Sequence, residues 1–125
     1  MIRILVCILS ALAFPLSAAE LPGTWKGSLQ ITGPNGQPQA EGCYMVLKQS
    51  GTAITGFVGP DRSVRWSIQN GRAGGARITF AVFPPEGGRL AFDLRLAGNR
   101  LTGEARGENQ GQTFVAKADL TRTTD

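Results

Sequence analysis

Few side chains in this chain could carry out chemistry. It contains no histidine and two cysteines, Cys7 and Cys43. The lack of histidine excludes the commonest general base, the serine–histidine–aspartate triad and imidazole metal sites. Cys7 lies in an N-terminal apolar run that we expect to be removed as part of a signal peptide. The one remaining cysteine, Cys43, cannot form a thiolate metal cluster. Carboxylates are the remaining candidates, and we expect no catalytic residue, no metal site and no cofactor.

A segment that occurs twice predicts the hairpins that position these carboxylates. The sequence GTAITG at 51–56 recurs as GNRLTG at 98–103. Each copy is typical of a two-residue turn that runs into a strand, with residues at the turn that tolerate positive φ. The turns place Leu47 opposite Gly56 and Leu94 opposite Gly103. A slip of one residue would reverse every side chain, so the agreement of the two copies supports the register.

The same register places Asp93 opposite Glu104 on the outer face of the second hairpin. Like charges that are directly opposed destabilise a sheet unless something neutralises them. A functional interpretation is a divalent cation or a shared proton between the two carboxylates. A structural interpretation is that Arg95 and Arg106, on the same face, screen them. We favour the structural interpretation.

Alternating apolar and polar residues predict eight strands and no helix. The expected strands are 24–32, 41–49, 53–58, 62–69, 76–83, 89–96, 100–106 and 112–122. Glycine, proline and asparagine separate them, including a break at 71–75. Eight short sequential strands favour an all-β fold, an eight-stranded antiparallel up-and-down (meander) β-barrel, with a β-sandwich as the alternative.

Small inward residues favour the barrel, because they permit bends and leave interior volume unfilled. These residues are Gly27, Gly56, Gly103, Ala105, Ala116 and Ala118.

Residues 1–19 predict a secretory signal peptide. Arg3 provides an early positive charge, an apolar run extends from Ile4 to Phe14, and small residues at 17–19 offer a cleavage site. The run is shorter than the roughly 20 residues of a membrane-spanning helix. We therefore expect residues 20–125 to form one exported domain, periplasmic or secreted, without a transmembrane segment.

The charge of the chain does not indicate nucleic-acid binding. The formal net charge is +4, and the basic residues are spread along the sequence without a polybasic arm. Cys43 shares strand parity with Met45 and Leu47, so we expect its thiol to be sheltered.

Five aromatic residues share inward parity and are the candidate ligand-binding residues. They are Trp25, Trp66, Phe80, Phe92 and Phe114. In a barrel of eight strands such side chains either fill the interior or line a cavity for one small ligand. Both alternatives remain open from the sequence.

The opening Gly23-Thr24-Trp25 and Arg122 near the end of the last strand resemble the calycin group, which includes lipocalins and avidins. The resemblance implies that Trp25 plugs one end of the barrel and that Arg122 stacks on it. The whole of 20–125 is also similar to small exported barrel domains of bacteria.

We expect an exported, non-enzymatic binding protein that takes a small apolar or amphipathic ligand in the barrel mouth. The alternative is a cell-envelope module with a filled barrel that contacts a protein partner through outward Phe57, Phe83 and an arginine-rich outer face, as an inhibitor or accessory subunit. An enzyme is the third interpretation.

Overall fold

The computed structural model describes residues 21–32, 38–85, 87–109 and 111–123, so the predicted signal peptide lies outside the described residues. The described residues form nine β-strands. They are β1 (Gly23–Thr32), β2 (Pro38–Ser50), β3 (Ala53–Gly59), β4 (Trp66–Ser67), β5 (Gln69–Gly74), β6 (Arg77–Val82), β7 (Arg89–Ala97), β8 (Arg100–Asn109) and β9 (Gln112–Thr123). In this part of the chain there is no helix with the length and apolar character of a membrane span.

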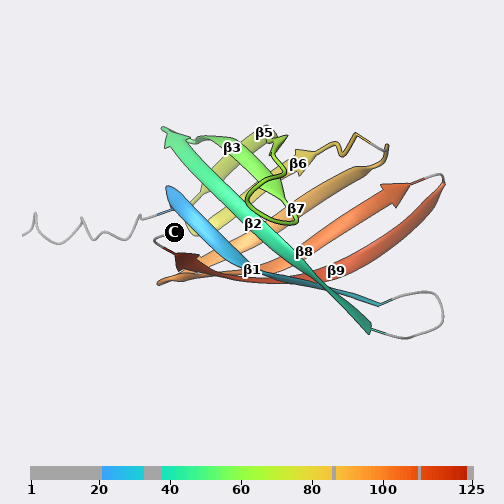
Figure 1. Cartoon of the computed structure of the whole chain (residues 1–125). Coiled ribbons are helices and arrows are strands. Elements are labelled where there is room, and N and C mark those ends of the chain that lie inside the picture. Colours follow the sequence, from blue (N-terminus) through green and yellow to red (C-terminus); the bar gives the residue numbers. More distant parts are fainter. Residues whose placement is uncertain (1–20, 33–37, 86, 110, 124–125) are drawn as a thin grey trace, which may run out of the picture.

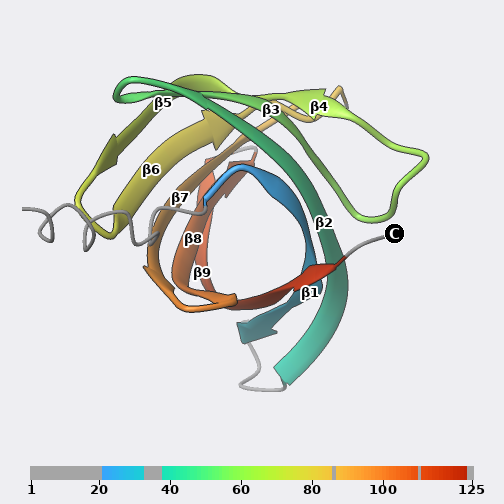
Figure 2. The same cartoon turned by 90° about the vertical axis from the view of Figure 1, so that its left-hand side faces the viewer.

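Eight of these strands close into one antiparallel barrel (Figure 1). Its neighbours follow the order β1, β2, β3, β5, β6, β7, β8 and β9, and β9 pairs back with β1. Figure 2, a view from one end, shows the ring closing where β1 lies between β2 and β9. The short β4 pairs only with β3 and lies outside the ring. The predicted eight-stranded up-and-down barrel is confirmed, and the sandwich is excluded.

The predicted register of both hairpins is also confirmed. Leu47 lies opposite Gly56, and Leu94 lies opposite Gly103. The turns begin with a glycine at φ 62° in both hairpins. Asn99, the second turn residue of the second hairpin, does not have a positive φ, so each turn depends on glycine only at its first position.

The inward glycines of these hairpins do not leave empty space, contrary to expectation. A Cβ atom at Gly56 would overlap the carbonyl oxygen of Val46, and one at Gly103 would overlap that of Asp93. Adjacent strands therefore approach each other so closely here that no side chain fits between the backbones. The glycines permit the sharp coiling of the barrel wall, and any cavity must come from elsewhere.

The predicted strand at 62–69 is wrong in its position. Residues 60–65 form a loop, because the carboxylate of Asp61 accepts hydrogen bonds from the backbone N–H and the hydroxyl of Ser63 at 2.8 and 2.6 Å. The side chain thus holds a local turn that competes with strand pairing. Within 62–69, only Trp66 and Ser67, as β4, pair with β3, and Gln69 begins β5.

The predicted break at 71–75 is instead occupied by most of β5. A bulge between Gln69 and Arg72, with Asn70 at φ 55°, accommodates the irregular segment beside β3 and β6. The chain turns later, at Gly75, where φ is 62°. The number of barrel strands was therefore predicted correctly although the fourth one was misplaced.

The close approach at Gly103 yields a stability prediction. Gly103→Ala should lower the free energy of unfolding by about 1–3 kcal/mol, because the added methyl group overlaps the β7 backbone. The matched control is Gly74→Ala, since a Cβ atom at that strand glycine meets nothing within 4 Å. Urea denaturation of both variants measures the difference. Equal midpoints would contradict the close approach of the β7 backbone to Gly103.

Candidate functional site

One end of the barrel is closed by a tryptophan. Trp25 is 0% exposed, and its indole N–H donates a hydrogen bond to the carbonyl oxygen of Leu21 at 3.0 Å. The guanidinium of Arg122 lies 4.4 Å from the centre of the indole. Arg122 also donates hydrogen bonds to the carbonyl oxygen of Pro22 at 2.9 Å and to the side-chain oxygen of Asn99 at 3.3 Å. The contact between plug and arginine that the calycin resemblance implies is therefore present.

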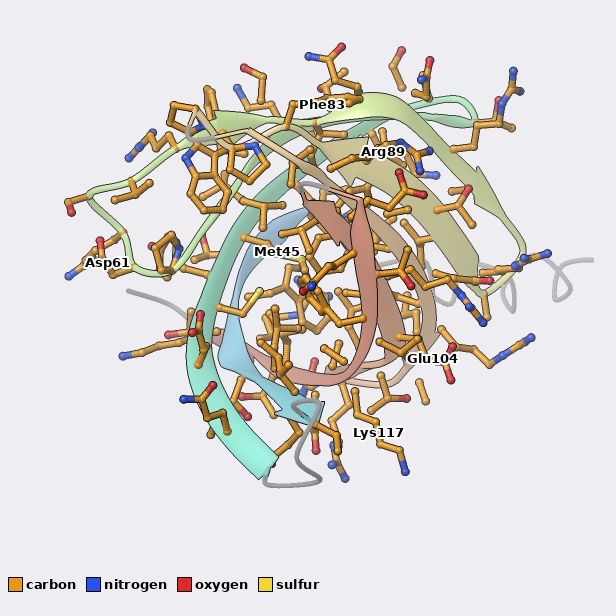
Figure 3. The ribbon with its side chains drawn as sticks, turned by 90° about the vertical axis from the view of Figure 1, so that its right-hand side faces the viewer. Met45, Asp61, Phe83, Arg89, Glu104 and Lys117 are labelled. Carbon is orange, nitrogen blue, oxygen red and sulfur yellow. The ribbon has the colours of Figure 1, made fainter. Side chains whose placement is uncertain are left out.

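A pocket of about 190 Å³ lies at the opposite end of the barrel. Its wall comes from the ends of β1, β3 and β8, from the beginnings of β2, β7 and β9, from β4, and from the loop between β6 and β7. Figure 3 views the molecule from this end: Met45 points into the interior, whereas Glu104 and Lys117 point away from the barrel. The interior is thus filled at one end and open at the other.

Three of the five predicted aromatic residues line this pocket: Trp66, Phe92 and Phe114. The tip of the Phe114 ring lies against Gly107, where a Cβ atom would overlap it. Phe80 is 4% exposed and stacks on Phe92 with 4.9 Å between ring centres. It therefore packs against a residue of the pocket wall without lining the pocket itself. Trp25 lies at the closed end and does not line the pocket.

The aliphatic part of the wall and one carboxylate were not predicted from the sequence. Leu29 and Ile31 of β1, Val58 of β3 and Leu90 of β7 line the pocket, and Glu41 of β2 lies at its mouth. Their inward parity was readable from the strand pattern. Their position at the open end was not, because it depends on how the strands are staggered around the barrel.

Cys43 is buried, as predicted, and its residue lines the same pocket. Burial in apolar surroundings raises the pKa of its thiol to about 12. The thiol is therefore protonated at neutral pH and contributes a weakly polar, uncharged surface to the wall. It is also unreactive, because the thiolate is the reactive form.

The opposed pair Asp93 and Glu104 lies where the sequence predicted it, with both side chains exposed. Its main neutralising partner is Arg77 of β6, which donates hydrogen bonds to both carboxylate oxygens of Asp93 at 2.9 and 2.8 Å. These bonds lower the pKa of Asp93, and the positive charges of Arg77, Arg95 and Arg106 act in the same direction.

A guanidinium nitrogen of Arg106 lies 3.6 Å from a carboxylate oxygen of Glu104, in line with the predicted screening. The role of Arg77 was missed because it depends on the pairing of β6 with β7. Among the residues that the structure describes, no group of three or more histidine, cysteine, aspartate or glutamate residues could hold a metal ion.

Comparisons with family models, with curated proteins and with solved structures found no match for this chain.

The raised pKa of Cys43 predicts slow labelling. At pH 9 an unfolded cysteine is largely ionised, whereas native Cys43 should remain protonated until the pH approaches about 12. A thiol reagent should therefore modify Cys43 slowly in native protein and rapidly in urea, as followed by mass spectrometry of its peptide. Rapid native labelling, or a dimer linked through Cys43, would show that the thiol is accessible.

The arginine partners of Asp93 and Glu104 predict no response to divalent cations. Calcium or magnesium should leave the melting temperature unchanged, because a ligand that binds only the native state must raise it. Asp119→Asn is the matched control for Asp93→Asn, since Asp119 is also exposed and paired with an arginine. A rise that grows with metal concentration and disappears only in Asp93→Asn would assign a metal site to the pair.

Proposed function

We propose that this protein is a non-enzymatic binding protein that takes one small apolar or amphipathic molecule in the pocket at the open end of the barrel. The observation that carries the proposal is the wall of this pocket, in which aliphatic side chains and the rings of Trp66, Phe92 and Phe114 surround about 190 Å³. Apolar pockets with few polar groups are typical of small-molecule sites. Binding is favoured over catalysis because the chain has no histidine and its opposed carboxylates are neutralised by arginines.

The size of the pocket limits the ligand. Sites for drug-sized ligands usually measure roughly 300–1,000 Å³, whereas a dry cavity of about 150 Å³ accepts a molecule the size of benzene. The pocket therefore suits a single aromatic ring or a short branched chain. A longer molecule would insert one end and leave the rest outside.

We also infer that the barrel is of the calycin type and that the protein is exported to the periplasm or secreted. The first inference is supported by the eight-stranded meander together with the contact between Trp25 and Arg122. The second is supported by the composition of residues 1–19, which lie outside the described residues.

A second candidate function is contact with a protein partner in the cell envelope. Phe83 is 52% exposed and Val115 is 42% exposed, and large apolar side chains at such exposure can mark an interface. Charged residues of β7 and β8 separate them, however, since Arg106 pairs with Val115 and Arg89 begins β7. Phe57 is half-buried, with the guanidinium of Arg65 5.4 Å from its ring centre. The apolar residues therefore do not merge into one patch, which favours the pocket.

The proposal predicts that a larger side chain in the pocket weakens binding. Leu90→Phe should weaken the binding of small aromatic and terpenoid probes by about tenfold, because the larger side chain occupies the pocket. Leu96→Phe is the matched control, since Leu96 lies on the same strand, is partly buried against the same core and does not line the pocket. Calorimetry gives the affinities, and quenching of Trp66 emission, absent in Trp66→Phe, reports the site. Equal effects of the two variants, or no binding by the unmodified protein, would contradict the proposal.

A further inference from the structure

The charged residues around the pocket are not equivalent. Glu41, Arg89 and Glu108 all contribute to its lining. Arg89 and Glu108 are cross-strand partners, and they alternate with the inward residues Leu90 and Gly107. Their side chains therefore belong to the outer face, where Arg89 also borders a separate groove on β6–β8.

Glu41 has the opposite parity. It lies two residues before buried Cys43 on β2, and it pairs with buried Leu29 on β1 without a break in the register. Its residue is exposed, which places the carboxylate at the mouth and not in the core. Among the described residues that line the pocket, Glu41 is thus the one charged residue on the inner face.

The carboxylate of Glu41 has no hydrogen-bonding or ion-pair partner among the residues that the structure describes. Asp93 and Asp119, by contrast, each pair with an arginine on the outer face. An unpaired carboxylate at the mouth of an apolar pocket favours a cation in its vicinity, because low-dielectric pocket walls concentrate the field of a charge at their opening.

The aromatic part of the wall favours the same charge. The faces of tryptophan and phenylalanine rings carry negative electrostatic potential and attract ammonium groups that lie within about 6 Å. Trp66, Phe92 and Phe114 supply three such rings in one pocket. An anionic ligand would meet both these rings and the carboxylate of Glu41 unfavourably.

We propose that the ligand of the pocket is a small organic cation, a primary amine or quaternary ammonium attached to an apolar group, with its charge at Glu41 and its apolar group among the aromatic rings. This inference rests on the proposed function, because it names the chemical class of the molecule that the pocket binds. The volume of about 190 Å³ limits the apolar group to about one ring.

Three probes that share one phenyl group but differ in charge test the inference: phenethylamine, phenethyl alcohol and phenylacetate. Calorimetry at neutral pH and low salt should show that the amine binds roughly tenfold more tightly than the alcohol, and that phenylacetate binds most weakly. Glu41→Gln should remove the preference for the amine while leaving the affinity for the alcohol unchanged. The matched control is Glu108→Gln, which changes an outward carboxylate at the same mouth and should preserve the preference.

The outcomes separate this inference from the proposed function. Equal binding of all three probes, or tightest binding of phenylacetate, would overturn the cation inference and leave the pocket as a binding site. A preference that disappears equally in Glu41→Gln and Glu108→Gln would also overturn it, because the effect would then be one of overall charge. If neither these three probes nor the small aromatic and terpenoid probes named above bind, both the cation inference and the proposed binding function would be overturned.

Discussion

The contact between Trp25 and Arg122 determines where the interior of this barrel is filled. Trp25 belongs to the first strand and Arg122 to the last, and the two residues are cross-strand partners at the seam where the ring closes. The guanidinium lies 4.4 Å from the indole centre and also holds the carbonyl oxygen of Pro22, so one side chain joins both ends of the barrel sheet. Trp25 is fully buried at this end, and the pocket lies at the other end.

In the middle of the barrel, large and small inward side chains lie side by side in cross-strand rows. Phe92 pairs with Ala105, which in turn pairs with Ala116, so one large ring lies beside two small side chains. All three are buried, and the stacking of Phe80 on Phe92 fixes the ring that forms the inner wall of the pocket. A pocket supported by packed rings and strand backbones is largely preformed, which reduces the entropic cost of binding.

The sequence predicted the barrel, its strand number and the register of two hairpins, because period-two alternation and glycine turns are local signals. It misplaced the fourth strand, since the turn at Asp61 and the bulge at Asn70 depend on side-chain hydrogen bonds and on neighbouring strands. It predicted three of the aromatic residues at the pocket. Parity did not separate them from Phe80, because it gives the face of a strand and not the depth along the barrel, whereas the calycin resemblance placed Trp25 at the closed end.

The distribution of charge differs between the outer face of the barrel and the mouth of the pocket. On the outer face, Arg77 pairs with Asp93 and Arg100 with Asp119, so neighbouring charges largely cancel and their field decays within a short distance in water. At the mouth, Glu41 pairs with no described arginine or lysine, since Arg89, the one described basic residue of the pocket lining, belongs to the outer face. Apolar walls concentrate the field of such a charge along the opening. The net positive charge of the chain therefore does not determine what the pocket attracts, and a single inward carboxylate can select a cation on a protein whose formal charge is +4.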